Sequence, residues 1–343
     1  MARSNRVAWQ NLSDEDLLKV RICDLGVRIE GSEVESRVWQ LYEELQDLGL
    51  FLRPRCYLSD EWLSPNGQAA IGIPFYLAHP RLRALEFRMM FEVEGGTPSA
   101  CMKLLRHEAA HALDYAYGLH RRADWQETFG SPRKRYSPYL YMADPHSKAH
   151  VRNLPENYAQ CHPEEDWAET FAVWLSRPSQ WRTRYKGWPA MKKLRFVNRL
   201  MREISERPVP RRKPVLHADI RNMRSTLMSY YRRKFRLYHL GDLSFAARDL
   251  KTIFRVSRAR EPDDLASALI RRHKRHLVES IVAWSGEGAG QASRVVARLA
   301  KLCDENRLVL RDDQDVSLVK LSTYVATLIA NRVHTSSYRL QNR

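Results

Sequence analysis

The stretch from Thr97 to Gly118 constrains the fold of this chain more than any other part of the sequence. It reads TPSACMKLLRHEAAHALDYAYG. Thr97 can cap a helix, Pro98 suits the first helical position and Gly118 can end the helix. Inside it, the pattern HEAAH places His107 and His111 four residues apart. The sequence therefore predicts one long helix that presents two imidazoles on the same face, one turn apart.

Two imidazoles in this arrangement can bind one metal ion, and Zn²⁺ suits imidazole ligands well. Glu108 stands next to the first histidine, where its carboxylate can take a proton from a water molecule that the metal activates. A hydrolytic zinc site also needs a third protein ligand. The pattern HExxHxxGxxH would supply a third histidine, but Asp114 and Tyr117 occupy its last two defining positions. The third ligand must therefore come from elsewhere in the chain.

The segment PEEDWAETFAVWL, which begins at Pro163, offers the best candidate for that ligand. Its apolar residues recur with helical spacing, so we expect a helix with one face in the core. Glu165 and Glu169 are four residues apart and share a face of this helix. Glu165 is the expected zinc ligand, and the second carboxylate can orient a ligand imidazole. Nearby His162 is the alternative ligand.

The rest of the first 205 residues predicts a mixed α and β structure. Ser13 can cap a short helix, and EVESRVWQLYEELQDLGL predicts an amphipathic helix that stops at Gly49. Two short strands are expected between residues 50 and 77, separated by the turn signal SPNG. Pro74 suits an edge strand, which could bind an extended substrate. Residues 121–158 are polar and aromatic, and they are expected to form a loop.

The stretch ERPVPRRKP predicts a linker, because its three prolines interrupt any helix. We therefore expect two domains, residues 1–205 and 206–343, of which the second is mostly helical. From residue 207 onward basic residues exceed acidic ones by 15, against an excess of only 2 before it. Basic clusters lie at 211–213, 230–236 and 271–276. An acidic protein partner or a nucleic acid is possible there, although helices also need charged outer faces.

Five cysteines at wide spacing, without a CxxC pair, argue against a disulfide framework and fit a reducing compartment. The sequence contains no run of about 18 apolar residues, so we expect no membrane-spanning helix. The first residues have no apolar core typical of a secretory signal. We therefore expect a cytoplasmic protein with no membrane partner.

The run HEAAHALDYAYG resembles the zinc helix of the lethal-factor branch of the gluzincins, which carries HExxHAxD. That branch takes its zinc glutamate from an ExxxE pair, here Glu165 and Glu169, and the resemblance implies that Glu169 holds a zinc histidine. It also implies that Tyr158, seven residues before Glu165, stabilises the developing oxyanion. Asp114 matches the branch, either as a surface residue or as a carboxylate that supports the ligands. Rival oxyanion donors are Tyr136, Tyr139 and Tyr141.

A wider similarity runs from SDEDLLKVRICDLG through IPFYLAHPRL and LRHEAAHALDYAY to HPEEDWAETFAVWL. Over about residues 10–205, the chain resembles a bacterial family of zinc-binding metallopeptidases. The resemblance implies an α+β fold with a zincin-like catalytic domain, followed by the basic helical domain. The implied activity is hydrolysis of peptide bonds in a protein or peptide substrate, with Zn²⁺ as cofactor and Glu108 as general base. Two alternatives remain open. One is a nucleic-acid-associated or regulatory protein whose metal site is structural or vestigial, and the other is a zinc hydrolase of a non-protein amide.

Overall fold

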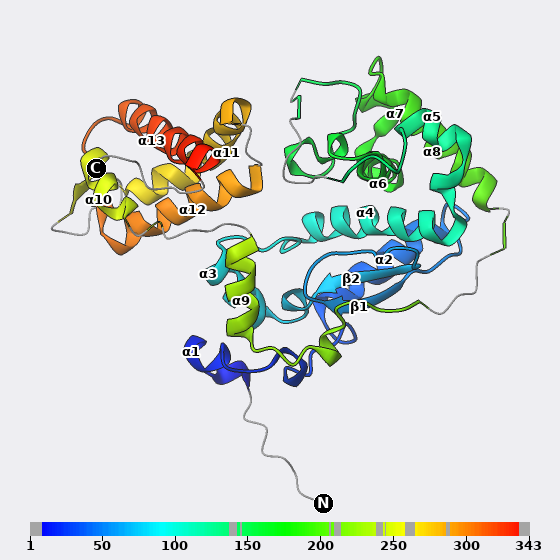
Figure 1. Ribbon diagram of the computed structural model, residues 1–343, viewed down its shortest axis with the longest axis horizontal. Coiled ribbons are helices and arrows are strands. Elements are labelled where there is room, and N and C mark those ends of the chain that lie inside the picture. Colours follow the sequence, from blue (N-terminus) through cyan, green and yellow to red (C-terminus); the bar gives the residue numbers. More distant parts are fainter. Residues whose placement is uncertain are drawn as a thin grey trace, which may run out of the picture. The chain divides into compact units, whose positions relative to one another are not determined.

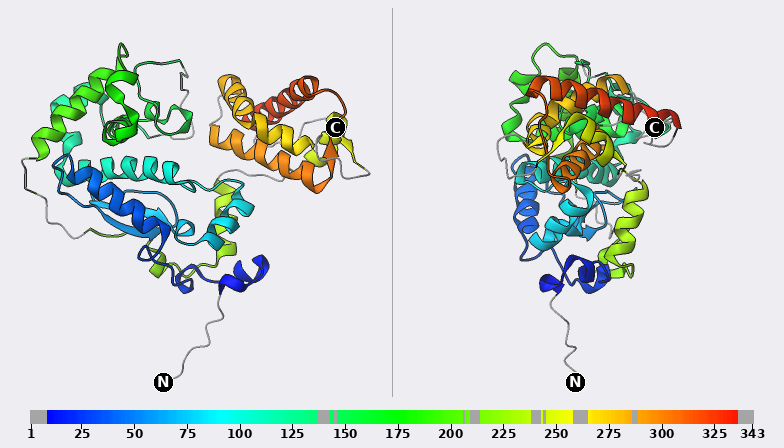
Figure 2. Two further views of the ribbon diagram at one scale, coloured as in Figure 1. Left: turned by 180° about the vertical axis from the view of Figure 1, so that it is seen from behind. Right: turned by 90° about the vertical axis from the view of Figure 1, so that its left-hand side faces the viewer.

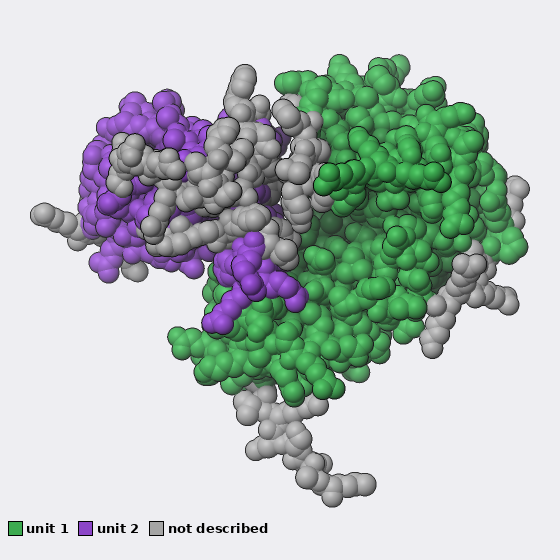
Figure 3. Space-filling view, in the orientation of Figure 1, with its two compact units in different colours: residues 1–89, 93–230 green, residues 90–92, 231–343 purple. Residues whose placement is uncertain are grey.

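The computed structural model divides into two compact units (Figures 1 and 3). The first unit comprises residues 1–89 and 93–230, and the second comprises 90–92 and 231–343. The fold is α+β, as expected: the part of the chain that the structure describes is mostly helical, with two small sheets. The structure describes residues 9–136, 143–144, 146–205, 207–208, 214–237, 243, 245–257, 265–285 and 289–335.

The first unit is built around one buried helix, α4 (Pro98–Tyr117), which begins and ends at the predicted residues. Thr97 Oγ1 accepts a hydrogen bond from the Ala100 backbone N–H, and Gly118 has the left-handed conformation that ends the helix. Helix α2 (Glu33–Gln46) and strand β2 (Ala70–Pro74) lie against one side of α4. Helix α6 (Pro163–Leu175) lies against the other, so α4 forms the middle of three layers (Figures 1 and 2).

Helices α4 and α6 pack closely around a small residue of α4. Ala110 is fully buried, and the indole N–H of Trp167 on α6 donates to the Ala110 carbonyl at 3.1 Å. Aromatic rings surround Trp167: Trp125 and Phe129 belong to α5 (Ala123–Phe129), a helix in the stretch that we expected to be a loop. This layer also contains α7 (Trp181–Arg184) and α8 (Ala190–Ser205).

The sheet of the first unit corrects one expectation. Strand β2 pairs in parallel with β1 (Arg55–Ser59), but its other side also has a neighbour, because Leu63 and Gly72 form an antiparallel bridge. All five residues of β2 are buried. A Cβ atom on Gly72 would lie 2.9 Å from Ser59 Cβ and 3.0 Å from Leu63 Cγ, so a glycine allows this close approach. The segment that contains Leu63, and not β2, forms the outer strand position.

The first unit also extends further along the chain than expected. The division falls after Tyr230, because residues following the proline-rich stretch return to the first unit. Tyr230 donates to the Asp60 carbonyl at 3.0 Å, and Tyr57 donates to the His217 carbonyl at 2.8 Å. The compact unit therefore continues beyond the proline-rich stretch. Shorter helices are α1 (Asp14–Leu17), α3 (Pro80–Met90) and α9 (Leu227–Leu237).

The second unit is helical, as predicted from its long amphipathic patterns. Leu250, Leu299 and Leu328 belong to its buried core, which draws on all of its main helices. A short antiparallel pair, β3 (Arg255–Val256) with β4 (Leu308–Val309), adjoins that core. The helices are α10 (Ala246–Ile253), α11 (Ala266–Ser285), α12 (Ala289–Glu305) and α13 (Gln314–Thr335).

Two further expectations concern the whole chain. All five cysteines are free thiols, and three of them are buried. Within the described residues, none of the helices combines the length and the apolarity needed to cross a bilayer.

The basic cluster at 211–213 lies outside the described residues. The clusters at 230–236 and 271–276 lie on α9 and α11, and their proposed acidic or nucleic-acid partner stays a prediction.

Candidate metal centre

Three predicted ligands meet in the core of the first unit. The Nε2 atoms of His107 and His111 lie 3.2 Å apart, one turn from each other on α4. Glu165 Oε2, on α6, lies 3.0 Å from His107 Nε2 and 3.5 Å from His111 Nε2. All three side chains are buried, at 3–7% exposure. The packing of α4 against α6 thus brings together side chains that are far apart in the sequence.

The chemistry of this group fits a divalent cation. The three donor atoms lie within 4.8 Å of one another. Glu165 Oε2 is buried and has no hydrogen-bond partner of acceptable geometry, although His107 Nε2 is near. A buried carboxylate oxygen without a partner is costly, so a ligand is expected to satisfy it. Two imidazoles and one carboxylate are a ligand set of catalytic zinc sites.

The charges of the group favour a cation in the same place. Burial alone lowers the pKa of His107, but the nearby carboxylates of Glu165 and Glu169 outweigh burial and hold that pKa well above its ordinary value. His111 shows the same balance, and its pKa is raised chiefly by the charge of Glu165. Burial raises the pKa of Glu165, but the two histidines outweigh it and lower that pKa. Protons and a metal ion would therefore compete for these donors.

Glu169 lies against the outer ring nitrogen of the first histidine. Its Oε1 lies 2.9 Å from His107 Nδ1. Asn153 donates to the same oxygen at 2.8 Å, and the backbone N–H of Leu154 donates to Oε2 at 2.7 Å. With Nδ1–H donating to Glu169, the lone pair of His107 Nε2 faces the metal position. No sequence pattern indicates Asn153, because it lies in an irregular segment.

Asp114 is fully buried and contacts His120. Its Oδ1 accepts the backbone N–H of His120 at 2.7 Å and lies 2.9 Å from the His120 ring Nδ1. Burial raises the pKa of Asp114, while His120 opposes that rise. Among the described residues, His111 Nδ1 and Asp114 Oδ2 are both buried without a hydrogen-bond partner. Through these contacts with His120, Asp114 supports the turn after α4.

Tyr158 lies beside the ligands, in the turn Pro155–Gln160. Its ring centroid is 5.8 Å from that of His107. Its hydroxyl lies 2.9 Å from the hydroxyl of Tyr136, which in turn donates to Glu165 Oε1 at 3.0 Å. Tyr136 is 47% exposed, so its ring is only partly buried. Removal from water, reinforced by the charge of Glu165, raises the pKa of both phenols, so they remain protonated donors at neutral pH. The other rival donors, Tyr139 and Tyr141, lie outside the described residues.

His162, the alternative ligand, has both ring nitrogens engaged elsewhere. Nδ1 accepts the backbone N–H of Glu164 at 3.2 Å and so caps α6. Nε2 lies 2.9 Å from the carbonyl oxygen of Lys134, to which it can donate. These two bonds leave no lone pair for a metal. His162 is instead the N-cap of α6, three residues before Glu165.

Glu108 is held through its backbone. Its carbonyl oxygen accepts a hydrogen bond from Ser64 Oγ at 2.8 Å, and the residue is 7% exposed. Among the contacts of the described residues, no ion pair or side-chain hydrogen bond engages its carboxylate. The acid thus sits next to the ligand His107 in the sequence and has unused capacity to accept a proton.

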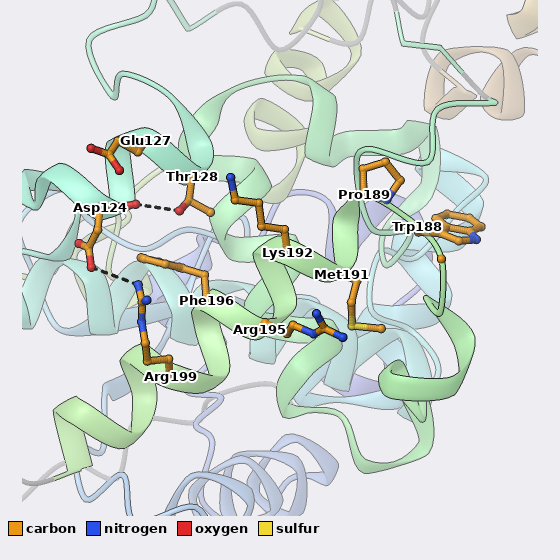
Figure 4. A pocket seen from close by; sticks show the side chains of 11 residues that line it. Asp124, Glu127, Thr128, Trp188, Pro189, Met191, Lys192, Arg195, Phe196 and Arg199 are labelled. Carbon is orange, nitrogen blue, oxygen red and sulfur yellow. Dashed lines mark hydrogen bonds and ion pairs between the residues drawn. The ribbon is translucent and has the colours of Figure 1, made fainter.

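A cavity of about 900 Å³ lies elsewhere in the first unit (Figure 4). Asp124 of α5, Trp188 of the turn before α8, and Arg195 and Arg199 of α8 line it. Asp124 Oδ2 lies 3.5 Å from Arg199 Nη2 across this space. The lining includes no member of the metal group, and its charged side chains are partly exposed to solvent. The size of the cavity therefore does not identify the site of chemistry.

Replacing Glu165 by alanine is expected to remove bound zinc. The side chain supplies one of three donors, so zinc affinity should fall by more than about 100-fold, beyond the usual effect of an outer hydrogen-bond partner. Elemental analysis of purified protein measures the zinc content. Glu164→Ala is the matched control, because Glu164 is the preceding residue and its side chain is 27% exposed. Equal zinc in the wild type and Glu165→Ala would contradict the ligand assignment.

Comparison with known proteins agrees with this geometry. No curated protein and no solved structure matches the chain. Residues 101–199 match the model of a family described as "Putative zinc-binding metallo-peptidase". The matched segment contains most of α4, all of α6 and every member of the metal group. The match supports a zinc-dependent peptidase in general, and residues 101–199 are the part of the chain that resembles this family.

Proposed function

We propose that this protein is a zinc-dependent peptidase that hydrolyses peptide bonds with Glu108 as general base. The observation that carries the proposal is the convergence of His107, His111 and Glu165 on one buried point. Glu108 lies next to this point in the sequence, on the same helix. A purely structural metal site needs no such base, whereas a hydrolytic site does.

Each residue has a distinct role in the proposal. A zinc ion held by the three ligands supplies Lewis acidity, which polarises a carbonyl and makes water a stronger acid. Glu108 accepts the proton of the attacking water and passes it to the leaving amine. Glu169 keeps His107 in the tautomer that a ligand requires. Tyr158 donates a hydrogen bond to the oxygen on which negative charge develops.

The outer strand position supports a way to bind an extended substrate. The segment around Leu63 bridges β2 on one side, and its neighbour Ser64 is bonded to the Glu108 carbonyl. A peptide that adds to this segment would pass the general base. The edge strand that we expected around residues 70–77 does not offer a free side for strand addition, because β2 is paired on both sides.

A peptide-cleavage assay with metal removal tests the function. Purified protein is incubated with a mixture of peptides of diverse sequence, and new termini are identified by mass spectrometry. Cleavage is expected with zinc-loaded protein, should be lost after chelation and dialysis, and should return when one equivalent of Zn²⁺ is added, because the metal supplies the Lewis acid.

The outcomes separate the alternatives. Zinc-loaded protein that cleaves no peptide but hydrolyses small non-peptide amides would favour the amidohydrolase. Cleavage that persists after chelation, with zinc absent by elemental analysis, would contradict a zinc mechanism. A chain that retains zinc and hydrolyses nothing would favour a structural metal site.

A further inference from the structure

Tyr136 is fixed beside the metal group by contacts with the start of α6. His162 Nε2 lies 2.9 Å from the carbonyl oxygen of Lys134, two residues before Tyr136. The rings of Tyr136 and His162 meet edge to face, with centroids 5.3 Å apart. His162 also caps α6. It therefore contacts both the helix that carries Glu165 and the segment that carries Tyr136.

The Tyr136 hydroxyl takes part in two hydrogen bonds but has only one proton to donate. It donates to Glu165 Oε1 at 3.0 Å and lies 2.9 Å from the Tyr158 hydroxyl. Because a phenol has one O–H, donation to Glu165 makes Tyr136 the acceptor for Tyr158. The hydrogen bonds therefore run in one direction, from Tyr158 to Tyr136 to Glu165.

This chain gives the two oxygens of Glu165 different partners. Oε1 is engaged by Tyr136, whereas Oε2 faces the two imidazoles and has no hydrogen bond. A charge-assisted bond to Oε1 fixes the rotation of the carboxylate. It thereby leaves one oxygen for the metal and opposes binding through both oxygens.

We propose that Tyr136 is a positioning residue that turns the Glu165 carboxylate toward the metal with one oxygen and holds the Tyr158 hydroxyl beside the site. This inference rests on the proposed function, in which Glu165 is a zinc ligand. It assigns to the residue at position 136 a task separate from oxyanion stabilisation. Tyr158 is then free to exchange its bond with Tyr136 for a bond to the substrate oxygen.

Zinc affinity measured against a competing chromophoric chelator tests this role without any substrate. Tyr136→Phe keeps the ring that packs on His162 and removes only the hydroxyl. Its zinc dissociation constant is expected to rise by about 10- to 100-fold. Tyr158→Phe should stay within about threefold of the wild type, because its hydroxyl does not touch Glu165. Tyr117→Phe, at the far end of α4, controls for loss of a phenol.

The absorption spectrum of the Co²⁺-substituted protein gives a second readout. Loss of the Tyr136 hydroxyl should allow both oxygens of Glu165 to bind, and a higher coordination number weakens the visible bands of Co²⁺. Equal zinc affinity and equal spectra in Tyr136→Phe and the wild type would overturn the inference. A weaker zinc affinity in a chain that cleaves no peptide would uphold it and reject the peptidase. A wild-type chain without zinc affinity would overturn both.

Discussion

Replacement of Glu108 by glutamine is expected to abolish peptide cleavage while one zinc ion per chain is retained. Glutamine has nearly the shape of glutamate but cannot accept the proton of the attacking water. General acid–base catalysis of this kind contributes about 10²- to 10⁴-fold, so kcat should fall by that factor. Zinc should remain because the metal group consists of His107, His111 and Glu165, without Glu108.

The measurement is kcat on a cleaved peptide, with zinc content determined on the same preparation. Glu43→Gln is the matched control: it makes the same chemical change on the exposed face of α2 and should leave kcat unchanged. Cleavage by Glu108→Gln at close to the wild-type rate would reject the general base. Another carboxylate near the ligands would then be the general base.

The parts of the site that were predictable depend on local sequence signals. Thr97 and Gly118 mark the ends of α4 by capping chemistry, and the spacing of His107 and His111 fixes their common face. The helix that carries Glu165 was predicted from its apolar spacing and begins at Pro163, as expected. Helical periodicity determines which residues share a face, so it also paired Glu165 with Glu169.

The parts that were not predictable depend on contacts between distant segments. Asn153 contacts Glu169 and Tyr136 contacts Glu165 from irregular segments, where no periodicity indicates the direction of a side chain. The pairing of Asp114 with His120 depends on the turn after α4. The edge position was assigned to residues 70–77 because Pro74 suits an edge. In the structure Pro74 ends β2, and the segment around Leu63 covers its free side.

A buried ion pair next to His107 is the basis of the second large expected effect, a loss of stability. Arg106 Nε donates to Glu44 Oε2 at 2.7 Å, and Arg106 Nη2 donates to Glu44 Oε1 at 2.6 Å. The two side chains are only 8% and 10% exposed. This pair joins α2 to α4 one residue before His107. Loss of one partner would leave the other charge buried and without compensation.

Glu44→Ala is therefore expected to lower the free energy of unfolding by about 3–5 kcal/mol, measured by urea denaturation with tryptophan fluorescence. Glu33→Ala is the matched control. Its bidentate partner is Arg83, but Glu33 is 67% exposed, so solvent screens the pair and the loss should stay below about 1 kcal/mol.

The double variant Glu44→Leu with Arg106→Met distinguishes the pair's own contribution from the cost of an uncompensated charge. Replacing both partners by apolar side chains of similar size removes the attraction and the burial of charge together, so much of the lost stability should return. If the double variant is instead as unstable as Glu44→Ala, the directional bonds themselves hold α2 on α4. In that case zinc affinity should also fall, because α4 carries both zinc histidines and loses its support on the side opposite α6.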